Sequence, residues 1–215
     1  MQIDVLGIVI VLGVILVSMI LHELAHGLVA YALGDTTAKE EGRLTLNPIK
    51  HIDPVFSVAV PLILYLTGGP IFGGANPVPV NSRNLKFGVW GMALVAIAGP
   101  LTNFILALVA FLIGYNLGIF TTYSGVATEI FVNLVMVNLG FFVFNILPIP
   151  PLDGSRVLYA IAPDGAREVM ERIERTAGLF LVLILVVVLS SVLSRLLSGM
   201  IGGILNFFYM LVGIS

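Results

Sequence analysis

Runs of apolar residues dominate the chain and predict helices that cross a membrane. A membrane-spanning helix needs roughly 20 apolar residues. Two runs, Val55–Thr67 and Met200–Ile214, are short for a crossing. The clearest candidates for full crossings are Val5–Leu33, Phe87–Leu117, Val126–Leu147 and Leu179–Leu197. The pattern predicts an all-α polytopic membrane protein with a bundle of about 4–6 transmembrane helices.

Two polar segments interrupt the apolar runs. Gly68–Asn84, GGPIFGGANPVPVNSRN, is rich in Gly, Pro and Asn, which favours a loop or an extended segment over a helix. It is either a solvated surface loop or a short extended element near the active site, where it would pair with an unwound substrate. In Asp164–Thr176, Arg and Glu alternate at helical spacing, which predicts an interfacial or cytoplasmic helix.

The composition agrees with a single membrane domain. Hydrophobic residues make up 59% of the chain and charged residues 10%, and the mean hydropathy is +1.10, values typical of polytopic membrane proteins. The net charge of -2 gives no indication of a nucleic-acid partner. We expect one domain, 1–215, with a core at 18–160, a polar helix at 164–177 and C-terminal hydrophobic helices at 178–215.

The basic residues indicate how the spans are oriented, because Lys and Arg in short loops stay on the cytoplasmic side. If Val55–Thr67 enters the membrane without crossing it, all of the basic residues except Arg195 face one compartment. They are Lys39, Arg43, Lys50, Arg83, Lys86, Arg156, Arg167, Arg172 and Arg175. We therefore expect the N-terminus outside the cell and a re-entrant or half-spanning helix at Val55–Thr67.

The sequence LHELAH, Leu21–His26, places three ionisable side chains inside the first apolar run. Each such group at mid-bilayer costs on the order of 2.5–3.5 kcal/mol, so a metal or partners must compensate. His22 and His26 share one helix face, as in the H-E-x-x-H pattern of zinc sites. A Zn²⁺ there would take both histidines, a third protein ligand and a water, with Glu23 as general base. The alternative is a histidine pair that only hydrogen-bonds to neighbouring helices.

The third ligand must be a histidine or a carboxylate, because the chain has no cysteine. The position six residues after His26, which is histidine in metzincins, is Ala32. The candidates are His51 and the acidic residues. Among these Asp153 stands out in FNILPIPPLDG, where prolines break the end of a long helix. The alternative for Asp153 is to cap a helix that begins near Ser155.

The direction of the spans also favours Asp153. The histidine pair lies late in the first span, and Asp153 lies just beyond the end of Val126–Leu147. These residues reach the same face only if the two spans run in the same direction, which requires an odd number of crossings between them. Phe87–Leu117 supplies one crossing, so Val55–Thr67 should not add another.

Five motifs in this order resemble the site-2 protease family of intramembrane zinc metalloproteases, the M50 peptidases, in the small bacterial and archaeal branch without a PDZ domain. They are LHELAH (Leu21–His26), LNPIKHIDP (Leu46–Pro54), NPVPVNSRNL (Asn76–Leu85), GPLTNFILA (Gly99–Ala107) and FNILPIPPLDG (Phe144–Gly154). The resemblance covers roughly residues 18–160.

The resemblance implies an endopeptidase that cuts peptide bonds in or near transmembrane segments of membrane proteins, with one Zn²⁺ per chain. It implies His22, His26 and Asp153 as zinc ligands and Glu23 as the base that activates the zinc-bound water. It also implies a multi-pass protein of the cell membrane, with the active site nearer the cytoplasmic face. The expected partners are a substrate's transmembrane segment and the lipid bilayer, with a homo-oligomer or a regulatory partner left open.

Three further polar residues have two interpretations each. Asn145 matches the motif asparagine, which would donate to the oxyanion or hold the substrate, or would only bond to another helix. Asn103 would fix helix packing next to Gly99-Pro100 or contribute a polar group near the site. His51 would orient a zinc ligand or another carboxylate, or would cap the segment before Asp53.

Two other functions use the same residues. In a metal-ion transporter or sensor, the histidines, Glu23 and Asp153 would form a transit site. In the integral membrane zinc proteases that trim prenylated proteins, the third ligand is a later Glu or His, here Glu129 or one of the acids of the polar segment, Glu168, Glu171 and Glu174. We also expect substrate gating to rest on the membrane domain, on Gly68–Asn84 or on a partner, because 215 residues leave no room for a PDZ or nucleotide-binding domain.

Overall fold

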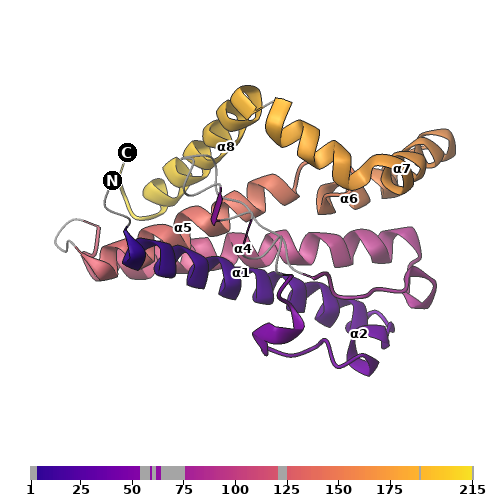
Figure 1. The fold of residues 1–215 in the computed structure, drawn as a ribbon, viewed down its shortest axis with the longest axis horizontal. Coiled ribbons are helices and arrows are strands. Elements are labelled where there is room, and N and C mark those ends of the chain that lie inside the picture. The colour runs from indigo at the N-terminus through magenta and orange to yellow at the C-terminus, as the bar shows by residue number, and fades with distance from the viewer. Residues whose placement is uncertain are drawn as a thin grey trace.

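Three long helices lie side by side and form the centre of the protein. The computed structural model describes residues 4–53, 59, 62–63, 76–120, 125–188 and 190–214, and every regular element in these ranges is helical. The three are α1 (Val5–Ala32), α4 (Val89–Asn116) and α5 (Val126–Asn145). α1 and α5 run in one direction and α4 in the opposite one (Figure 1), which is the arrangement that the order of the spans predicted. The all-α prediction is confirmed.

Helix α1 is long enough to cross a membrane with residues to spare. Its 28 residues extend about 42 Å at 1.5 Å per residue. The Asp4 carboxylate caps its first turn by accepting a hydrogen bond of 3.0 Å from the Gly7 N–H. After Ala32 the chain turns at Gly34, whose φ of 107° suits a residue without a side chain.

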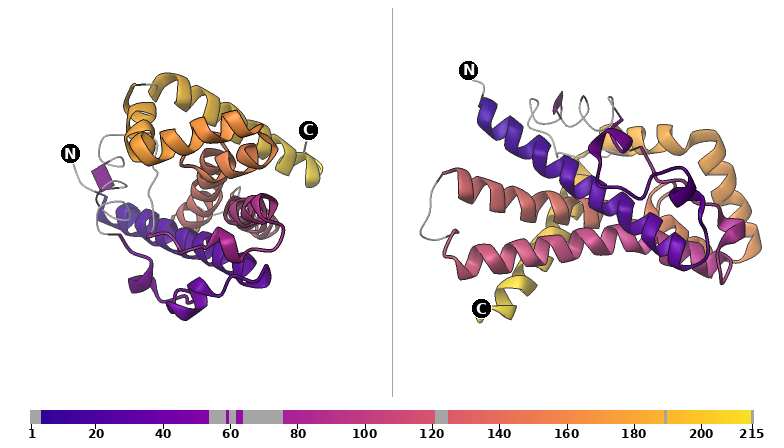
Figure 2. Two further views of the ribbon diagram at one scale, coloured as in Figure 1. Left: turned by 90° about the vertical axis from the view of Figure 1, so that its right-hand side faces the viewer. Right: turned by 90° about the horizontal axis from the view of Figure 1, so that it is seen from below.

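Apolar side chains join the helices in two main clusters. The cluster between α1 and α5 consists of Val11, Val14, Ile15, Met19, Val137 and Phe141. A second cluster joins α4 and α5 to α8 (Ser190–Leu211), which crosses them obliquely (Figure 2), and consists of Ala107, Ala110, Phe111, Val135, Leu139 and Phe208. The buried polar residues Ser18, Asn103 and Asn138 also join the three long helices, and each lies near the middle of its helix.

Within the described residues, four helices have the length and hydropathy of membrane spans, namely α1, α4, α5 and the Val192–Leu211 part of α8. The predicted span Leu179–Leu197 is wrong, because this apolar stretch is divided between α7 (Asp164–Val188) and α8. The polar helix predicted from residue 164 is confirmed as the first part of α7.

Short elements connect the long helices at the end of the bundle where α1 finishes. They are α2 (Thr37–Glu40) and two 3₁₀ turns, η1 (Pro48–Lys50) and η3 (Ser82–Asn84). The predicted half-spanning helix Val55–Thr67 lies almost wholly outside the described residues. Of Gly68–Asn84, residues 76–84 are described, and Asn76–Val80 is irregular backbone, as the sequence predicted.

Helix α6 (Asp153–Ile161) lies against α4 and carries the polar helix α7 on its outer side. Arg156 of α6 forms an ion pair with Glu174 of α7. The Tyr159 hydroxyl donates a hydrogen bond of 2.7 Å to the Glu171 carboxylate. These contacts fix α7 beside the start of α6, where Asp153 is located.

Candidate metal centre

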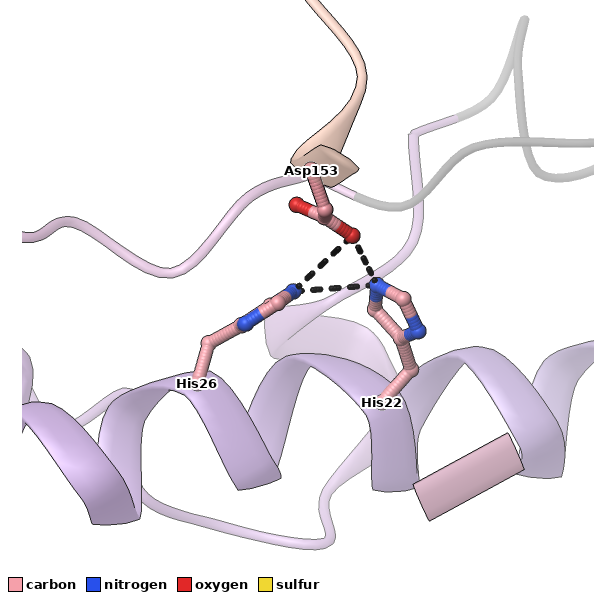
Figure 3. Close-up of side chains that lie close together, drawn as sticks. All are labelled: His22, His26 and Asp153. Carbon is pink, nitrogen blue, oxygen red and sulfur yellow. Dashed lines mark hydrogen bonds and ion pairs between the residues drawn. The ribbon is translucent and has the colours of Figure 1, made fainter. Parts of the chain in front are cut away.

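His22, His26 and Asp153 converge on one point between α1 and the start of α6. The Nε2 atoms of the two histidines are 3.0 Å apart, and Asp153 Oδ2 lies 3.1 Å from His22 Nε2 and 3.5 Å from His26 Nε2. Figure 3 shows the three side chains pointing toward one another. Both histidine residues are buried. The structure therefore brings together the two motif histidines and the carboxylate from the broken helix.

The hydrogen bonds of the two rings determine which nitrogen faces this point. His22 Nδ1 lies 2.6 Å from Asn103 Oδ1, and His26 Nδ1 lies 2.7 Å from the Val95 carbonyl oxygen. Both partners are acceptors, so each Nδ1 carries the proton and each neutral ring has its lone pair on Nε2. Asp153 Oδ2 is buried and has no hydrogen-bond donor in the described part of the chain. Three electron-pair donors thus meet at one place.

A buried polar network supports His22 from behind. Asn103 accepts from His22 Nδ1, and its Nδ2 donates to Asn138 Oδ1 at 2.8 Å and to the Ser18 carbonyl oxygen at 3.4 Å. Asn138 Nδ2 in turn donates to Ser18 Oγ at 2.9 Å. The network joins α1, α4 and α5: Asn103 contacts His22 and bonds to residues of two other helices.

Two glycines allow the backbone to approach the cluster. A Cβ atom at Gly99 would lie 2.6 Å from His22 Nε2 and even closer to His26 Nε2, so only glycine lets α4 pass beside the two rings. A Cβ atom at Gly154 would lie 2.6 Å from the Leu147 carbonyl oxygen. Gly154 therefore lets the start of α6 fold back onto the end of α5, which directs Asp153 toward the histidines.

Asp153 is the first residue of α6, not its N-cap. The N-cap is Leu152, and no side chain caps the helix. The capping role considered for Asp153 is therefore wrong, because its carboxylate is directed at the histidines and away from the free N–H groups of its own helix.

Glu23 lies beside the cluster in a cavity of about 270 Å³. Its Oε2 accepts a hydrogen bond of 2.8 Å from the Val78 N–H. His26, Asp153 and Arg156 also line this cavity. A second cavity of about 640 Å³ shares Arg156 and Met92 with it and reaches the charged residues of α7. The two cavities are therefore neighbours.

The other predicted residues lie outside the cluster. His51 is 1% exposed, and its Nε2 donates to the Thr45 carbonyl oxygen at 2.8 Å. Its main chain also accepts from the Asn76 N–H at 2.8 Å, so His51 organises the connection after α2. Asn145 donates to the Phe141 carbonyl oxygen of its own helix at 3.0 Å. Its role toward an oxyanion or a substrate stays a prediction.

The acidic residues proposed as alternative third ligands lie elsewhere. Glu129 is next to Gly7, since a Cβ atom at Gly7 would lie 2.8 Å from Glu129 Oε1. Gly7 precedes His22 on α1 by 15 residues, or about 22 Å at 1.5 Å per residue. Glu171 and Glu174 bond to side chains of α6 and α7. In the described residues, His22, His26 and Asp153 are the group whose geometry could hold a metal ion.

The residues of this group fit zinc. Two imidazole nitrogens and one carboxylate oxygen are the ligands of many catalytic zinc sites, and three protein ligands leave room for water or substrate. The three donor atoms all lie within 4.8 Å of one another. A cation here would pair with the lone pairs of both Nε2 atoms and with the unpartnered Asp153 Oδ2.

Comparison with known proteins gives the family. The model of Peptidase family M50 matches residues 118–189. The chain is 43% identical over 175 residues to the "Putative zinc metalloprotease YwhC" of Bacillus subtilis (strain 168), a match that covers 79% of this chain and 77% of the relative. The chain belongs to peptidase family M50. As an M50 peptidase it is a zinc metalloprotease, and its apolar helices make it a membrane protein.

More distant M50 relatives agree with this assignment. The chain is 32% identical over 144 residues to the "Putative zinc metalloprotease Rip2" of Mycolicibacterium smegmatis, covering 66% of this chain and 53% of the relative. Rip2 of Mycobacterium tuberculosis (strain H37Rv) is 31% identical over 174 residues, covering 79% and 63%. No solved structure matches the chain. The family favours a protease over the metal transporter or sensor considered above.

Sequence analysis missed Ser18, Asn138 and Val78 as neighbours of the M50 site. Ser18, His22 and His26 are spaced by four residues on one face of α1, so the serine carried a positional signal. Asn138 is a polar residue within an apolar span, which is itself a signal of helix contact or function. Val78 contributes a backbone N–H, for which the side-chain pattern gives no signal.

Proposed function

We propose that this M50 peptidase hydrolyses peptide bonds in or near the transmembrane segments of other membrane proteins. In this proposal His22, His26 and Asp153 bind one zinc ion and Glu23 is the general base. The observation that carries it is the convergence of three electron-pair donors, two from the mainly apolar helix α1 and one from the start of α6. Such a cluster is costly in a membrane unless a cation is bound.

Zinc bound by such ligands supplies a Lewis acid that polarises a carbonyl group and lowers the pKa of a coordinated water toward ~7. The protein residues supply the rest. His22 and His26 offer their Nε2 lone pairs because Asn103 and Val95 hold the proton on each Nδ1. Both rings are thereby fixed in tautomer and orientation before the metal binds.

Glu23 is the residue placed to move protons. Its carboxylate lines the same cavity as His26 and Asp153 but is not one of the converging donor atoms. One carboxylate oxygen is held by the Val78 N–H, which restricts the rotation of the side chain. Glu23 would take a proton from the attacking water and deliver it to the leaving nitrogen.

The cavity also suggests how a substrate and water reach the site. Pro77, Val78 and Val80 form one wall, so the irregular backbone of Asn76–Val80 runs beside the Glu23 carboxylate. A substrate segment that unwinds from its helix exposes the peptide groups that could lie along this wall. The neighbouring cavity, whose lining includes the charged residues Arg83, Arg156, Glu171, Glu174 and Arg175, would bring water to a site that lies among apolar helices.

We further propose that the protein lies in the cell membrane with its N-terminus outside and its site nearer the cytoplasmic face. The connections at the end of α1, the start of α4 and the end of α5 carry most of the basic residues, which favours that end as cytoplasmic. Because the chain has no cysteine, single cysteines can be introduced as probes. In intact cells an impermeant maleimide should label Leu117→Cys and not Lys50→Cys, both at exposed positions, and the reverse pattern would contradict this topology.

Two variants test the proposed chemistry in purified full-length protein with a reporter transmembrane substrate. Glu23→Gln should abolish cleavage and leave zinc bound, because Glu23 is a base and not a ligand. Asp153→Ala should lose zinc as well as activity, measured by elemental analysis. Asp164→Ala is the matched control, since Asp164 also begins a helix but forms an exposed ion pair with Arg167.

The outcomes separate the competing functions. Cleavage of the reporter by Glu23→Gln would contradict the proposed mechanism, and full retention of zinc by Asp153→Ala would remove this residue from the site. Zinc uptake into proteoliposomes that depends on His22, without cleavage of any reporter, would instead support the transporter.

A further inference from the structure

The peptide group between Pro77 and Val78 connects two charged side chains. Its carbonyl oxygen accepts a hydrogen bond of 3.2 Å from Arg43 Nη2, which also donates to the Asn76 carbonyl oxygen at 2.6 Å. Its N–H donates to Glu23 Oε2 at 2.8 Å. A cation therefore bonds to one end of this peptide group and the carboxylate of the proposed base bonds to the other.

Both hydrogen bonds act on the same rigid unit. A peptide group is planar, so the position of its carbonyl determines the direction of its N–H. A cation at the carbonyl and an anion at the N–H polarise the group in the same sense, which strengthens both bonds. Arg43 therefore governs the donor that holds Glu23, although its guanidinium bonds to carbonyl oxygens and not to Glu23.

Packing against α1 holds Val78 in the same place. Gly27 follows Glu23 by four residues and lies on the same face of α1. A Cβ atom at Gly27 would lie 3.0 Å from Val78 Cγ1 and 2.5 Å from Leu44 Cδ2, and Val78 is buried. Gly27 thus leaves space on α1 for the Val78 side chain, one helical turn beyond Glu23, whose carboxylate accepts the hydrogen bond from the Val78 N–H.

A second anchor holds the chain beyond Val80. The buried Asp35 carboxylate accepts hydrogen bonds from the Asn81 N–H at 2.7 Å and from Asn84 Nδ2 at 3.1 Å. The segment Asn76–Asn84, called the strap below, is consequently bound at Asn76 and Pro77 by Arg43 and at its other end by Asp35. Arg43 is the anchor nearer to Glu23.

We propose that Arg43 is a positioning residue for the hydrolysis: it holds the Pro77–Val78 peptide group so that the Val78 N–H fixes the Glu23 carboxylate toward the site. The inference rests on the proposed role of Glu23 as general base. Proton transfer requires the base within hydrogen-bond reach of the water, and small displacements of a catalytic group reduce the rate strongly. A lost strap contact therefore changes turnover more than zinc binding.

The first test compares three variants of the full-length protein in detergent, with kcat, KM and zinc content measured on a reporter transmembrane substrate. Arg43→Gln should lower kcat by about 10- to 100-fold, since a displacement of about 1 Å can cost on that order. KM should change much less, and zinc should stay at the wild-type level. Arg43→Lys, which keeps a cationic donor, should restore part of kcat. Arg172→Gln, an exposed arginine on α7, is the matched control and should behave as wild type.

The second test removes the backbone donor itself. Val78→Pro eliminates the N–H that bonds to Glu23, and the position already lies between two prolines, Pro77 and Pro79. Val78→Ala loses apolar contacts but keeps the N–H. The proline variant should lose kcat as Arg43→Gln does, and the alanine variant should lose much less. Combining Arg43→Gln with Val78→Pro should cost little more than either change alone, because both act through one hydrogen bond.

Three results would overturn the inference. The first is a wild-type kcat in Arg43→Gln. The second is that Arg43→Gln and Val78→Pro lose zinc as well as kcat, which would show a purely structural role. The third is additive loss in the double variant. If Arg43→Gln does not fold, the kcat, KM and zinc content of Arg43→Lys, Val78→Pro and Val78→Ala test the inference in its place. An active Glu23→Gln protein would refute the proposed function itself, whereas an inactive Glu23→Gln with a fully active Arg43→Gln would refute only the role of Arg43.

Discussion

Truncation of Asn103 tests whether the buried network prepares His22 for the metal. Asn103 is 0% exposed and bonds to His22 Nδ1 at 2.6 Å and to Asn138 Oδ1 at 2.8 Å. Asn103→Ala leaves the His22 N–H without its acceptor and the Asn138 oxygen without this donor. The ring of His22 is then free to rotate or to move its proton to Nε2, the nitrogen that faces Asp153.

The expected magnitude follows from these two side-chain groups, the His22 N–H and the Asn138 oxygen, each of which loses its bond to Asn103. Loss of a group that orients a metal ligand typically weakens metal binding by about 10- to 100-fold. This range corresponds to about 1.4–2.8 kcal/mol. Each buried polar group left without a partner costs about 1–3 kcal/mol of folding stability, so the unfolding free energy should fall by about 2–6 kcal/mol. Zinc affinity and stability should therefore both decrease.

The assay is competition for zinc between the detergent-solubilised protein and a chelator, together with thermal unfolding of the metal-free form. Asn116→Ala is the matched control, because Asn116 lies on the same helix and its described bond goes to the Leu112 carbonyl oxygen of that helix. Asn103→Asp keeps an acceptor for His22 and loses the donor to Asn138, so it should retain more zinc affinity than Asn103→Ala. Wild-type zinc affinity in Asn103→Ala would refute the reasoning.

Three further predictions concern the backbone around the site and the strap. Gly154→Ala should displace Asp153 and weaken zinc binding at least ~10-fold, because its Cβ would overlap the end of α5; wild-type affinity in the chelator assay would contradict this. Gly99→Ala should force the two imidazoles apart and destabilise the fold by about 1–3 kcal/mol, measured by denaturant unfolding, whereas Gly140→Ala, with open space around it, should not. Burial opposes ionisation of Asp35, but hydrogen bonds from Thr37, Asn81 and Asn84 outweigh it and hold the pKa of Asp35 below its ordinary value. The carboxylate therefore stabilises the fold fully above the unfolded pKa of about 3.9 and progressively less as the pH falls toward the folded pKa. The difference in unfolding midpoint between wild type and Asp35→Asn should accordingly be constant from about pH 7 to pH 5 and shrink below about pH 4; a difference independent of pH would contradict it.

The sequence predicted those parts of the site that depend on local pattern and on chain direction. Hydropathy located α1, α4 and α5 to within a few residues, because a helix in lipid must be apolar along its whole length. The spacing of His22 and His26 placed them on one helix face, and the alternation of span directions brought Asp153 to the same end of the bundle. A spacing of only one or two residues would have placed the histidines on different faces.

The C-terminal helices show where hydropathy alone was insufficient. Leu179–Leu197 is apolar enough to cross a membrane, and the sequence therefore predicted one span there. In the structure α7 ends at Val188 and α8 starts at Ser190. Serine residues are tolerated within transmembrane helices as well as at helix ends, so the local pattern did not decide between a continuous helix and a break.

The sequence by itself thus determined that this is a helical membrane protein. It also determined that the H-E-x-x-H pair lies on one span and that Asp153 follows another span of the same direction, because hydropathy and helical period act on neighbouring residues. Only the tertiary structure decided what holds these groups in place. Ser18 and Asn138 are 120 residues apart in the chain and meet only after α1 and α5 pack together. The bond from the Val78 N–H to Glu23 joins residues 55 positions apart through a backbone atom that every residue except proline carries. Such contacts depend on how helices and connections pack against one another in space. The sequence indicates this packing only indirectly, through the glycines at positions 27, 99 and 154, where a side chain would clash with a neighbouring segment.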